Sequence, residues 1–187
     1  MSGSSGETRN RSPETLAETA ARFRLSTGET LLDASGNQPL ALVFLRHFGC
    51  TFTRQILRGL EDLKHAADER GARLVLVHML KDGAEYRYLP AADEVARLGD
   101  PRCELYRAFG LGKGGFLELF GPKVLWLAVL AIFKGCGVGY LAGDGRQMPG
   151  AFLFHHGEVL AAQRARSASD LPDLPGLFSS PATPEAT

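Results

Sequence analysis

Two uninterrupted apolar runs separated by a helical stripe constrain the fold of this chain more than any other feature. Residues 40–45 read Leu-Ala-Leu-Val-Phe-Leu and residues 74–77 read Leu-Val-Leu-Val, without polar alternation. Such strands need cover on both faces, as the central strands of a parallel sheet have. Between them, from Phe52 to Ala67, apolar residues recur every three or four positions, and Gly71 ends this helical stripe. Strand, helix and strand at this spacing predict a right-handed βαβ unit.

Further strands and helices are predicted on both sides of this unit. Apolar residues 151–154 and 159–162 flank a tight turn, His155-His156-Gly157-Glu158, which predicts an antiparallel hairpin. The other expected elements are a helix over 13–21 capped by Ser12, a hairpin over 23–32, a turn over 33–39, a short helix or turn over 84–89, an edge strand over 95–98, a helix from Asp100-Pro101 to Gly110, an all-apolar helix over 124–133, a glycine-rich loop over 135–145 and a final helix. A parallel unit followed by a hairpin predicts an α/β fold with a mixed central sheet flanked by helices.

The two ends of the chain differ in composition from its centre. Residues 1–12 are rich in Ser, Gly and Arg, and residues 179–187 read Ser-Ser-Pro-Ala-Thr-Pro-Glu-Ala-Thr. Neither stretch has the apolar residues that a core needs. We therefore expect a disordered leader and a disordered tail around one domain over residues 13–178.

Charge and hydropathy exclude several classes of partner. The 187 residues include 21 Lys and Arg and 21 Asp and Glu, and no basic stripe argues for a nucleic acid. The apolar run at 124–133 falls short of the roughly 20 residues that a membrane span needs, and the N-terminus lacks the apolar core of a secretory signal. A cytoplasmic protein without membrane contact is expected. The apolar run would pack against the body or against a second copy, as in a homodimer.

The cysteines and histidines do not form a cofactor site in the sequence. Cysteines 50, 103 and 136 form neither a C-x-x-C pair nor a set with metal-ligand spacing. An odd, sparse set fits a reducing compartment better than a disulfide framework. His155 and His156 lack a third ligand, and no phosphate-binding glycine motif follows a strand. Neither a metal nor an organic cofactor is expected.

Cys50 is the residue most suited to chemistry. It stands where the first apolar strand passes, through residues 46–49, into the helix. A thiol at such a junction faces the unpaired N–H groups and the positive end of the helix dipole, which favour the nucleophilic thiolate. A free cysteine is more often inert packing, but the neighbours Arg46, His47 and Arg54 favour a reactive thiol here.

Three stretches of the chain, in order, match the motifs of one family. They are residues 43–50, ending in an Arg-x-x-Gly-Cys string and followed by Arg54; Asp100-Pro101 with Leu-Tyr-Arg-Ala-Phe-Gly-Leu at 105–111; and Gln-Met-Pro-Gly-Ala-Phe at 147–152, running through Gly157 to Arg164, Ser167 and Asp170. Together they resemble the peroxiredoxin-like branch of the alkyl hydroperoxide reductase/thiol-specific antioxidant family. The resemblance covers most of residues 23–175. It implies a thioredoxin-like fold, which agrees with the predicted order of elements, and a redox-active Cys50.

The chain departs from this family at two marker positions. Peroxiredoxins proper carry a Pro-x-x-x-Thr-x-x-Cys string, whereas here Val43 and His47 hold the Pro and Thr places. Relatives in the peroxiredoxin-like branch usually have Cys-x-x-Cys, and here the second position is Thr53. The chain therefore resembles a single-thiol version of the family, and the substrate class does not transfer with the resemblance.

Other candidate catalytic residues surround the thiol. Arg46 would hold a peroxide oxygen or stabilise the thiolate, the alternative being a solvated charge at a strand end. His47 would bind substrate and donate a proton, or be a hydrogen-bonded surface group. Thr53 would donate to the sulfur or cap a backbone N–H. Arg164 or Arg166 would take the part of the family's strand arginine beside the cysteine, and Arg164 is the preferred candidate.

Residues from the C-terminal part complete the predicted site. Phe48, Met148 and Pro149 are assigned to substrate binding. By resemblance, Pro149 occupies the place of the cis-proline that faces the cysteine in thioredoxin folds, so we expect a cis Met148–Pro149 bond. Cys136, in the glycine-rich loop, is the candidate resolving thiol, and Cys103 is expected to pack inside the body.

These observations predict a thiol oxidoreductase that reduces hydroperoxides through Cys50. Because Thr53 cannot form a disulfide, an external thiol would have to restore the oxidised cysteine. The alternative is a redox-inactive thioredoxin-fold module that binds a partner through the apolar surface at 124–133, with Cys50 as a relic.

Overall fold

The backbone forms a mixed sheet built around the predicted βαβ unit. The computed structural model describes residues 14–88, 95–114, 122, 126, 144–167 and 169–179. Over these residues the sheet has five strands in the order β3-β2-β1-β4-β5. The strands are β1 (Leu40–Phe44), β2 (Arg73–His78), β3 (Ala96–Gly99), β4 (Gly150–His155) and β5 (Glu158–Arg164). Strands β1, β2 and β3 are parallel, whereas β4 pairs antiparallel with both β1 and β5.

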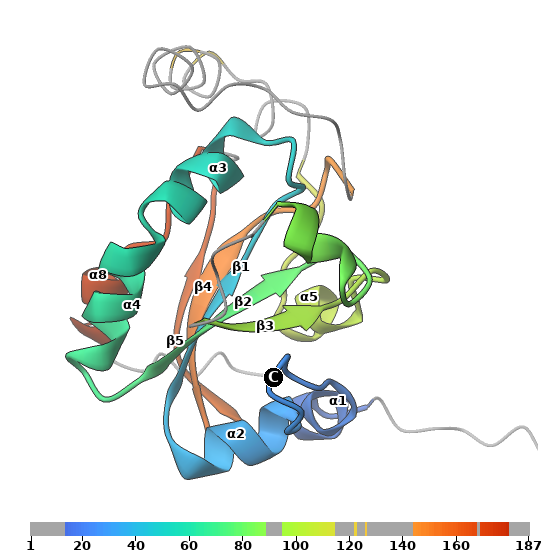
Figure 1. Ribbon diagram of the computed structural model, residues 1–187, viewed down its shortest axis with the longest axis vertical. Helices are drawn as coiled ribbons and strands as arrows, with labels where there is room; N and C mark the ends of the chain where they lie inside the picture. Colours follow the sequence, from blue (N-terminus) through green and yellow to red (C-terminus); the bar gives the residue numbers. More distant parts are fainter. Residues whose placement is uncertain are drawn as a thin grey trace, which may run out of the picture.

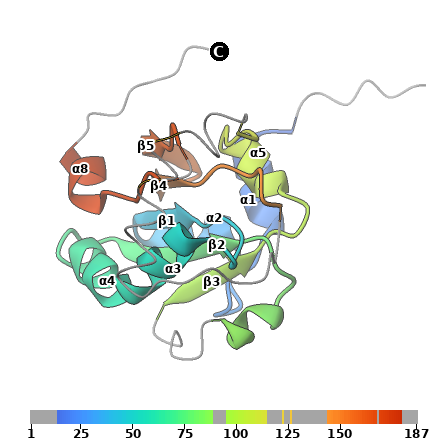
Figure 2. The same ribbon diagram turned by 90° about the horizontal axis from the view of Figure 1, so that it is seen from above.

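Helices cover both faces of the sheet, and β1 contributes to a separate core on each face. The helices are α1 (Leu16–Arg22), α2 (Leu31–Asn37), α3 (Thr51–Arg58), α4 (Leu60–Asp68), the 3-10 turn η1 (Ala84–Arg87), α5 (Glu104–Ala108) and α8 (Leu174–Ser179). Helices α3, α4 and α8 lie on one face, and α1, α2 and α5 lie on the other (Figures 1 and 2). Leu42 and Phe44 belong to the core with α5, and Ala41 and Val43 to the core with α3. Because alternate side chains serve both cores, the run has no polar residue.

The topology is that of the thioredoxin fold. A parallel strand–helix–strand unit, β1 to β2, is followed by an antiparallel hairpin whose first strand, β4, pairs with β1. The predicted fold class is confirmed. The hairpin turn is also as predicted, with Gly157 at φ 81°, and His156 beside it is left-handed as well, at φ 50°.

The predicted hairpin over 23–32 is present only as a minimal antiparallel pairing, and the predicted turn over 33–39 is wrong. The only pairing in the first of these stretches is an isolated bridge between Arg24 and Thr30, and the second forms most of helix α2. Thr30 caps this helix, since its Oγ1 accepts from the N–H of Asp33 over 3.0 Å. Leu31 and Ala34 are buried in the core. Capping and burial therefore outweigh the turn-forming tendency of Asp33 and the residues after it.

The predicted helix after Cys50 is divided into α3 and α4. The two segments meet at Gly59, whose N–H reaches the carbonyls of both Gln55 and Ile56. Glycine disfavours continuation of a helix by about 1 kcal/mol relative to alanine, which accounts for a break at this position. Ile56 in α3 and Ala67 in α4 still face the same core, so the predicted apolar stripe holds across the break.

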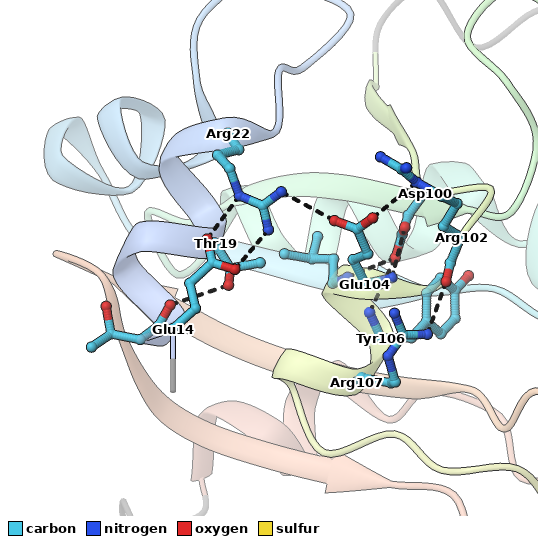
Figure 3. A network of polar contacts seen from close by, with 10 residues as sticks. Glu14, Thr19, Arg22, Asp100, Arg102, Glu104, Tyr106 and Arg107 are labelled. Carbon is cyan, nitrogen blue, oxygen red and sulfur yellow. Dashed lines mark hydrogen bonds and ion pairs between the residues drawn. The ribbon is translucent and has the colours of Figure 1, made fainter. Parts of the chain in front are cut away.

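Helix α5 begins later than predicted. Pro101 lies in a turn before the helix, and Cys103, at φ 53°, is the residue that precedes its first turn. Asp100 nevertheless supplies the cap, because its carboxylate accepts from the N–H groups of Glu104, Leu105 and Tyr106 at 2.8–3.2 Å. Figure 3 shows this cap.

Helix α1 begins at Leu16, after the predicted start at residue 13. Thr15 and Glu18 form a reciprocal capping box at its N-terminus. In its last turn, Arg22 lies between Glu14, at 2.8 Å, and Glu104, at 3.1 Å (Figure 3). These exposed ion pairs tie the start of the domain to α5.

Several predictions concern residues outside this description. They are the leader over 1–12, the helix over 124–133 apart from Trp126, the glycine-rich loop before residue 144 and the tail from residue 180. Within the part of the chain that is described, no helix is long and apolar enough to cross a membrane.

Candidate active site

Cys50 lies at the carboxyl end of β1, at the start of α3. It occupies the N-cap position with extended backbone angles, φ −74° and ψ 130°, and is 6% exposed. Its N–H bonds to the carbonyl of His47 over 2.9 Å, which closes the turn from strand to helix, and its carbonyl accepts from Arg54 N–H. Its thiol makes no capping bond to α3. The sulfur therefore lies at the N-terminal end of α3, which is the positive end of the helix dipole.

Arg46 is the cation that contacts this sulfur. Its Nη1 donates to Cys50 Sγ over 3.1 Å, its Nη2 to Gly145 O over 2.6 Å and its Nε to Gln147 O over 3.4 Å. The side chain is only 8% exposed, so the alternative of a solvated strand-end charge is wrong. A guanidinium has five N–H groups in a fixed plane, so these contacts leave one on each terminal nitrogen for a further acceptor.

Thr53 makes neither of the two hydrogen bonds predicted for it. It lies on the first turn of α3 and is 1% exposed, and its Oγ1 has no hydrogen-bond partner among the described residues. A buried hydroxyl without a partner is uncommon and costly. The described part of the chain therefore leaves this buried hydroxyl unsatisfied.

His47 is half-buried and is not a hydrogen-bonded surface group. Its Nδ1 is buried and lacks a partner in the described part of the chain. Burial lowers the pKa of His47 from 6.5 to about 4, and the charge of Arg46 adds to this effect against a smaller opposing effect of Asp144. His47 is therefore neutral at pH 7, which excludes a standing imidazolium as proton donor.

The other three residues assigned to substrate binding lie in different surroundings. Phe48 is buried, and its ring stacks on Tyr88 with centroids 4.8 Å apart, so it packs in the core. Met148 is buried, and its N–H donates to Gly112 O over 3.2 Å. Pro149 lines a cavity of about 140 Å³ that also borders Ile56 and Arg164.

The expected cis Met148–Pro149 bond is wrong, since the described residues contain no cis peptide. The N–H of Met148 bonds to Gly112, and the carbonyl of Pro149 accepts from Ala165 N–H over 3.2 Å. The backbone on both sides of the Met148–Pro149 bond is thus already hydrogen-bonded where the chain enters β4. Without a contact that requires the cis form, the trans form is favoured by about 0.5–1 kcal/mol.

The structure places Arg164 beside Phe109. Its Nε donates to Phe109 O over 3.3 Å, and its guanidinium lies over the ring of Phe152, 5.5 Å from the centroid. Arg166 follows β5, and its N–H donates to Asp170. The arginine that donates to the sulfur of Cys50 is thus Arg46, which lies in the segment between β1 and α3.

The other two cysteines are not brought together with Cys50 by any described contact. Cys103 is a buried free thiol in the core with α5, which agrees with the predicted packing role. Burial, together with nearby Asp100, raises its pKa, so the unreactive protonated form is favoured. Cys136 lies outside the described residues. In the described part of the chain, no group of three His, Cys, Asp or Glu could hold a metal ion.

Sequence reasoning missed Gln147. The string that contains it was noted, but its side chain was not singled out, because glutamines are usually exposed. It is 1% exposed, and its carbonyl accepts from Arg46. The approach to β4 reads Asp-Gly-Arg-Gln-Met-Pro over 144–149, so one more polar residue there gives no signal of burial.

Several solved structures whose names refer to redox proteins are similar to this chain. One is the Xanthomonas campestris bacterioferritin comigratory protein, studied for alkyl peroxide reduction, with a TM-score of 0.47, 17% identity, and coverage of 76% of this chain and 79% of that one. A peroxiredoxin Q structure from the same organism has a TM-score of 0.43, 18% identity and 82% coverage of both chains. A putative thiol:disulfide interchange protein DsbE from Chlorobium tepidum has a TM-score of 0.47, 19% identity and coverage of 77% and 82%. No protein-family model matches the chain, and no curated protein matches it in sequence.

Proposed function

We propose that this protein is a single-thiol, peroxiredoxin-like oxidoreductase that reduces hydroperoxides. The contact between Arg46 Nη1 and Cys50 Sγ, 3.1 Å long and almost wholly buried, carries the proposal. A charged donor on a thiol at a helix N-terminus places positive charge against the sulfur and draws an electron-rich substrate toward it. An inert packing cysteine has no need of such a neighbour.

The reaction proposed for Cys50 is a two-electron oxidation of its sulfur. The thiolate attacks the terminal oxygen of R–O–O–H, so that an S–O bond forms as the O–O bond breaks. The leaving alkoxide takes a proton and departs as the alcohol, or as water from hydrogen peroxide. An external thiol then attacks the sulfenic sulfur and releases water, and a second thiol cleaves the mixed disulfide. Two thiols are oxidised for each peroxide reduced.

The other residues of the site have defined parts in this step. The second N–H on Arg46 Nη1, next to the one that donates to sulfur, has no acceptor among the described residues, and this donor would hold a peroxide oxygen. The unpartnered Thr53 hydroxyl would make a second hydrogen bond to the substrate. His47, which is neutral at pH 7, would face the substrate without adding a second positive charge beside Arg46. A cycle that depends on external thiols fits a reducing compartment such as the cytoplasm.

The decisive experiment traps the sulfenic acid. Reduced protein receives one equivalent of hydrogen peroxide or an alkyl hydroperoxide in the presence of dimedone, and the adduct is located by mass spectrometry. We expect the adduct on Cys50, its absence in Cys50→Ser, and no change in Cys103→Ser. Peroxide consumption with glutathione or dithiothreitol should follow the same pattern. Wild-type protein that gives no adduct and consumes no peroxide would contradict the function.

One observation favours the alternative binding module. Trp126 is 64% exposed, a large apolar side chain open to solvent within the apolar run predicted as a docking surface. If the module is redox-inactive, Cys50→Ser should leave any partner binding unchanged while Trp126→Ala weakens it. The dimedone experiment separates the two functions, because the binding module predicts no adduct.

A further inference from the structure

A buried glutamine, Gln147, belongs to the segment whose backbone carbonyls hold the active-site arginine, Arg46. Gln147 is 1% exposed, and its Nε2 donates to the carbonyls of Leu111 and Gly112, each over 3.1 Å. Its backbone also forms a bridge with Lys113. The side chain and the backbone of Gln147 thus join the approach to β4 to the segment that follows α5.

The segment that Gln147 holds in place presents two backbone carbonyls to Arg46. The Nη2 of Arg46 donates to Gly145 O and its Nε to Gln147 O, and both acceptors belong to the segment that the amide of Gln147 holds in place. These two bonds fix the plane of the guanidinium, whose remaining contact is with Cys50 Sγ. A long arginine side chain loses much conformational freedom when it is fixed. Because these bonds already hold the side chain in one orientation, its donors are in place before a substrate binds.

The amide chemistry of Gln147 is required by its surroundings. An apolar residue of the same size would take this donor from the carbonyl of Leu111, whereas Gly112 O would keep its bond from Met148 N–H. Packing alone does not call for glutamine at this position. The amide is therefore matched to the job of holding two segments together next to Arg46.

We propose that Gln147 is a positioning residue that sets the guanidinium of Arg46 against the sulfur and the substrate oxygen at Cys50. This inference rests on the proposed function, because it names how the peroxide site is organised. Gln147 touches neither the sulfur nor the substrate. Its effect on the reaction passes through Arg46.

A double-mutant cycle between the two residues tests this coupling. The variants are Gln147→Met, Arg46→Lys and the pair, assayed for the rate of Cys50 oxidation by peroxide and for its alkylation by iodoacetamide at pH 7. Gln147→Met should slow oxidation at least tenfold and alkylation by about threefold or less, since alkylation does not use the oxygen-holding donor. In the Arg46→Lys background it should slow neither reaction further.

The control is Gln163→Met, which removes a similar clamp elsewhere. The amide of Gln163 bonds to both the carbonyl and the N–H of Asp173, far along the chain from Arg46. It should leave both rates within twofold of wild type. If Gln147→Met does not fold, Gln147→Asn keeps a buried amide that is too short for both carbonyls and takes its place in the cycle.

The outcomes separate the two proposals. Effects of Gln147→Met and Arg46→Lys that multiply, or a Gln147 variant with wild-type rates, would overturn the positioning role. If wild-type Cys50 is not oxidised by peroxide, the proposed function fails, and the alkylation half of the cycle still decides whether Gln147 acts through Arg46.

Discussion

The hydroxyl of Tyr106 donates to the carbonyl of Leu45 over 2.6 Å, immediately before Arg46 in the chain. The same hydroxyl is 3.1 Å from the carbonyl of Val77, so one side chain of α5 joins the ends of β1 and β2. Tyr106 is fully buried, which raises its pKa well above 10 and keeps the donor proton in place. The loop that carries Arg46 and Cys50 therefore leaves the sheet from a fixed point.

Tyr106→Phe should destabilise the protein by about 1–3 kcal/mol, because it leaves the buried carbonyl of Leu45 without this donor, whereas Val77 O keeps its bond from Leu45 N–H. Urea unfolding of the variant and of wild type measures the difference. Tyr86→Phe is the control, since Tyr86 is 53% exposed, and it should change the free energy of unfolding by less than about 0.5 kcal/mol. Equal stability of Tyr106→Phe and wild type would show that the hydroxyl does not hold the strand ends.

The parts of this structure that sequence predicts are those decided by local pattern. The β1 run predicted burial on both faces because Leu42 and Val43 are both apolar. Helix α2 was missed because Asp33 and its successors favour turns, and the burial of Leu31 that outweighs them depends on distant elements.

The residues of the site divide in the same way, into those that local sequence predicts and those that depend on distant contacts. Cys50 at a strand–helix junction could be recognised from its neighbours in the sequence. The burial of Arg46 could not, because its acceptors at Gly145 and Gln147 lie about a hundred residues further along the chain. The assignment of Arg164 to the thiol depended on the register of β5, which sequence does not determine.

His47 should make stability depend on pH. Its pKa is about 4 in the folded protein and 6.5 in the unfolded chain, so between these values the unfolded state binds more protons. Stability contributed by neutral His47 is therefore present above pH 6.5 and is lost as the pH falls toward 4. Buried His78, whose pKa is also lowered, acts in the same direction.

Urea unfolding at pH 7 and pH 5 measures this effect. His47→Gln should lose less stability than wild type between the two values, whereas the exposed His65→Gln should behave as wild type. An unchanged pH dependence in His47→Gln would mean that His47 is protonated in the folded protein as readily as in the unfolded chain.

Cys103 should take no part in the redox cycle. It is buried among the side chains that pack against α5, on the face opposite α3, and burial favours its protonated form. After one equivalent of peroxide without added thiol, disulfide mapping by mass spectrometry should show no dominant crosslink between Cys50 and Cys103. A Cys50–Cys136 bond is expected only as a minor product. Either crosslink as the main product would make this a two-cysteine enzyme.

Thr53→Val should separate stability from activity. Since the Thr53 hydroxyl is buried without a partner in the described structure, its replacement by a methyl group should leave the free energy of unfolding unchanged or raise it by up to about 1 kcal/mol. If the hydroxyl binds the peroxide, the rate of Cys50 oxidation should fall about tenfold in the same variant. Thr19→Val is the matched control: Thr19 Oγ1 donates to Thr15 O over 3.1 Å, so this change should lower stability and leave the oxidation rate intact. A Thr53 variant that is less stable but oxidised at the wild-type rate would assign the hydroxyl to the fold instead of the substrate.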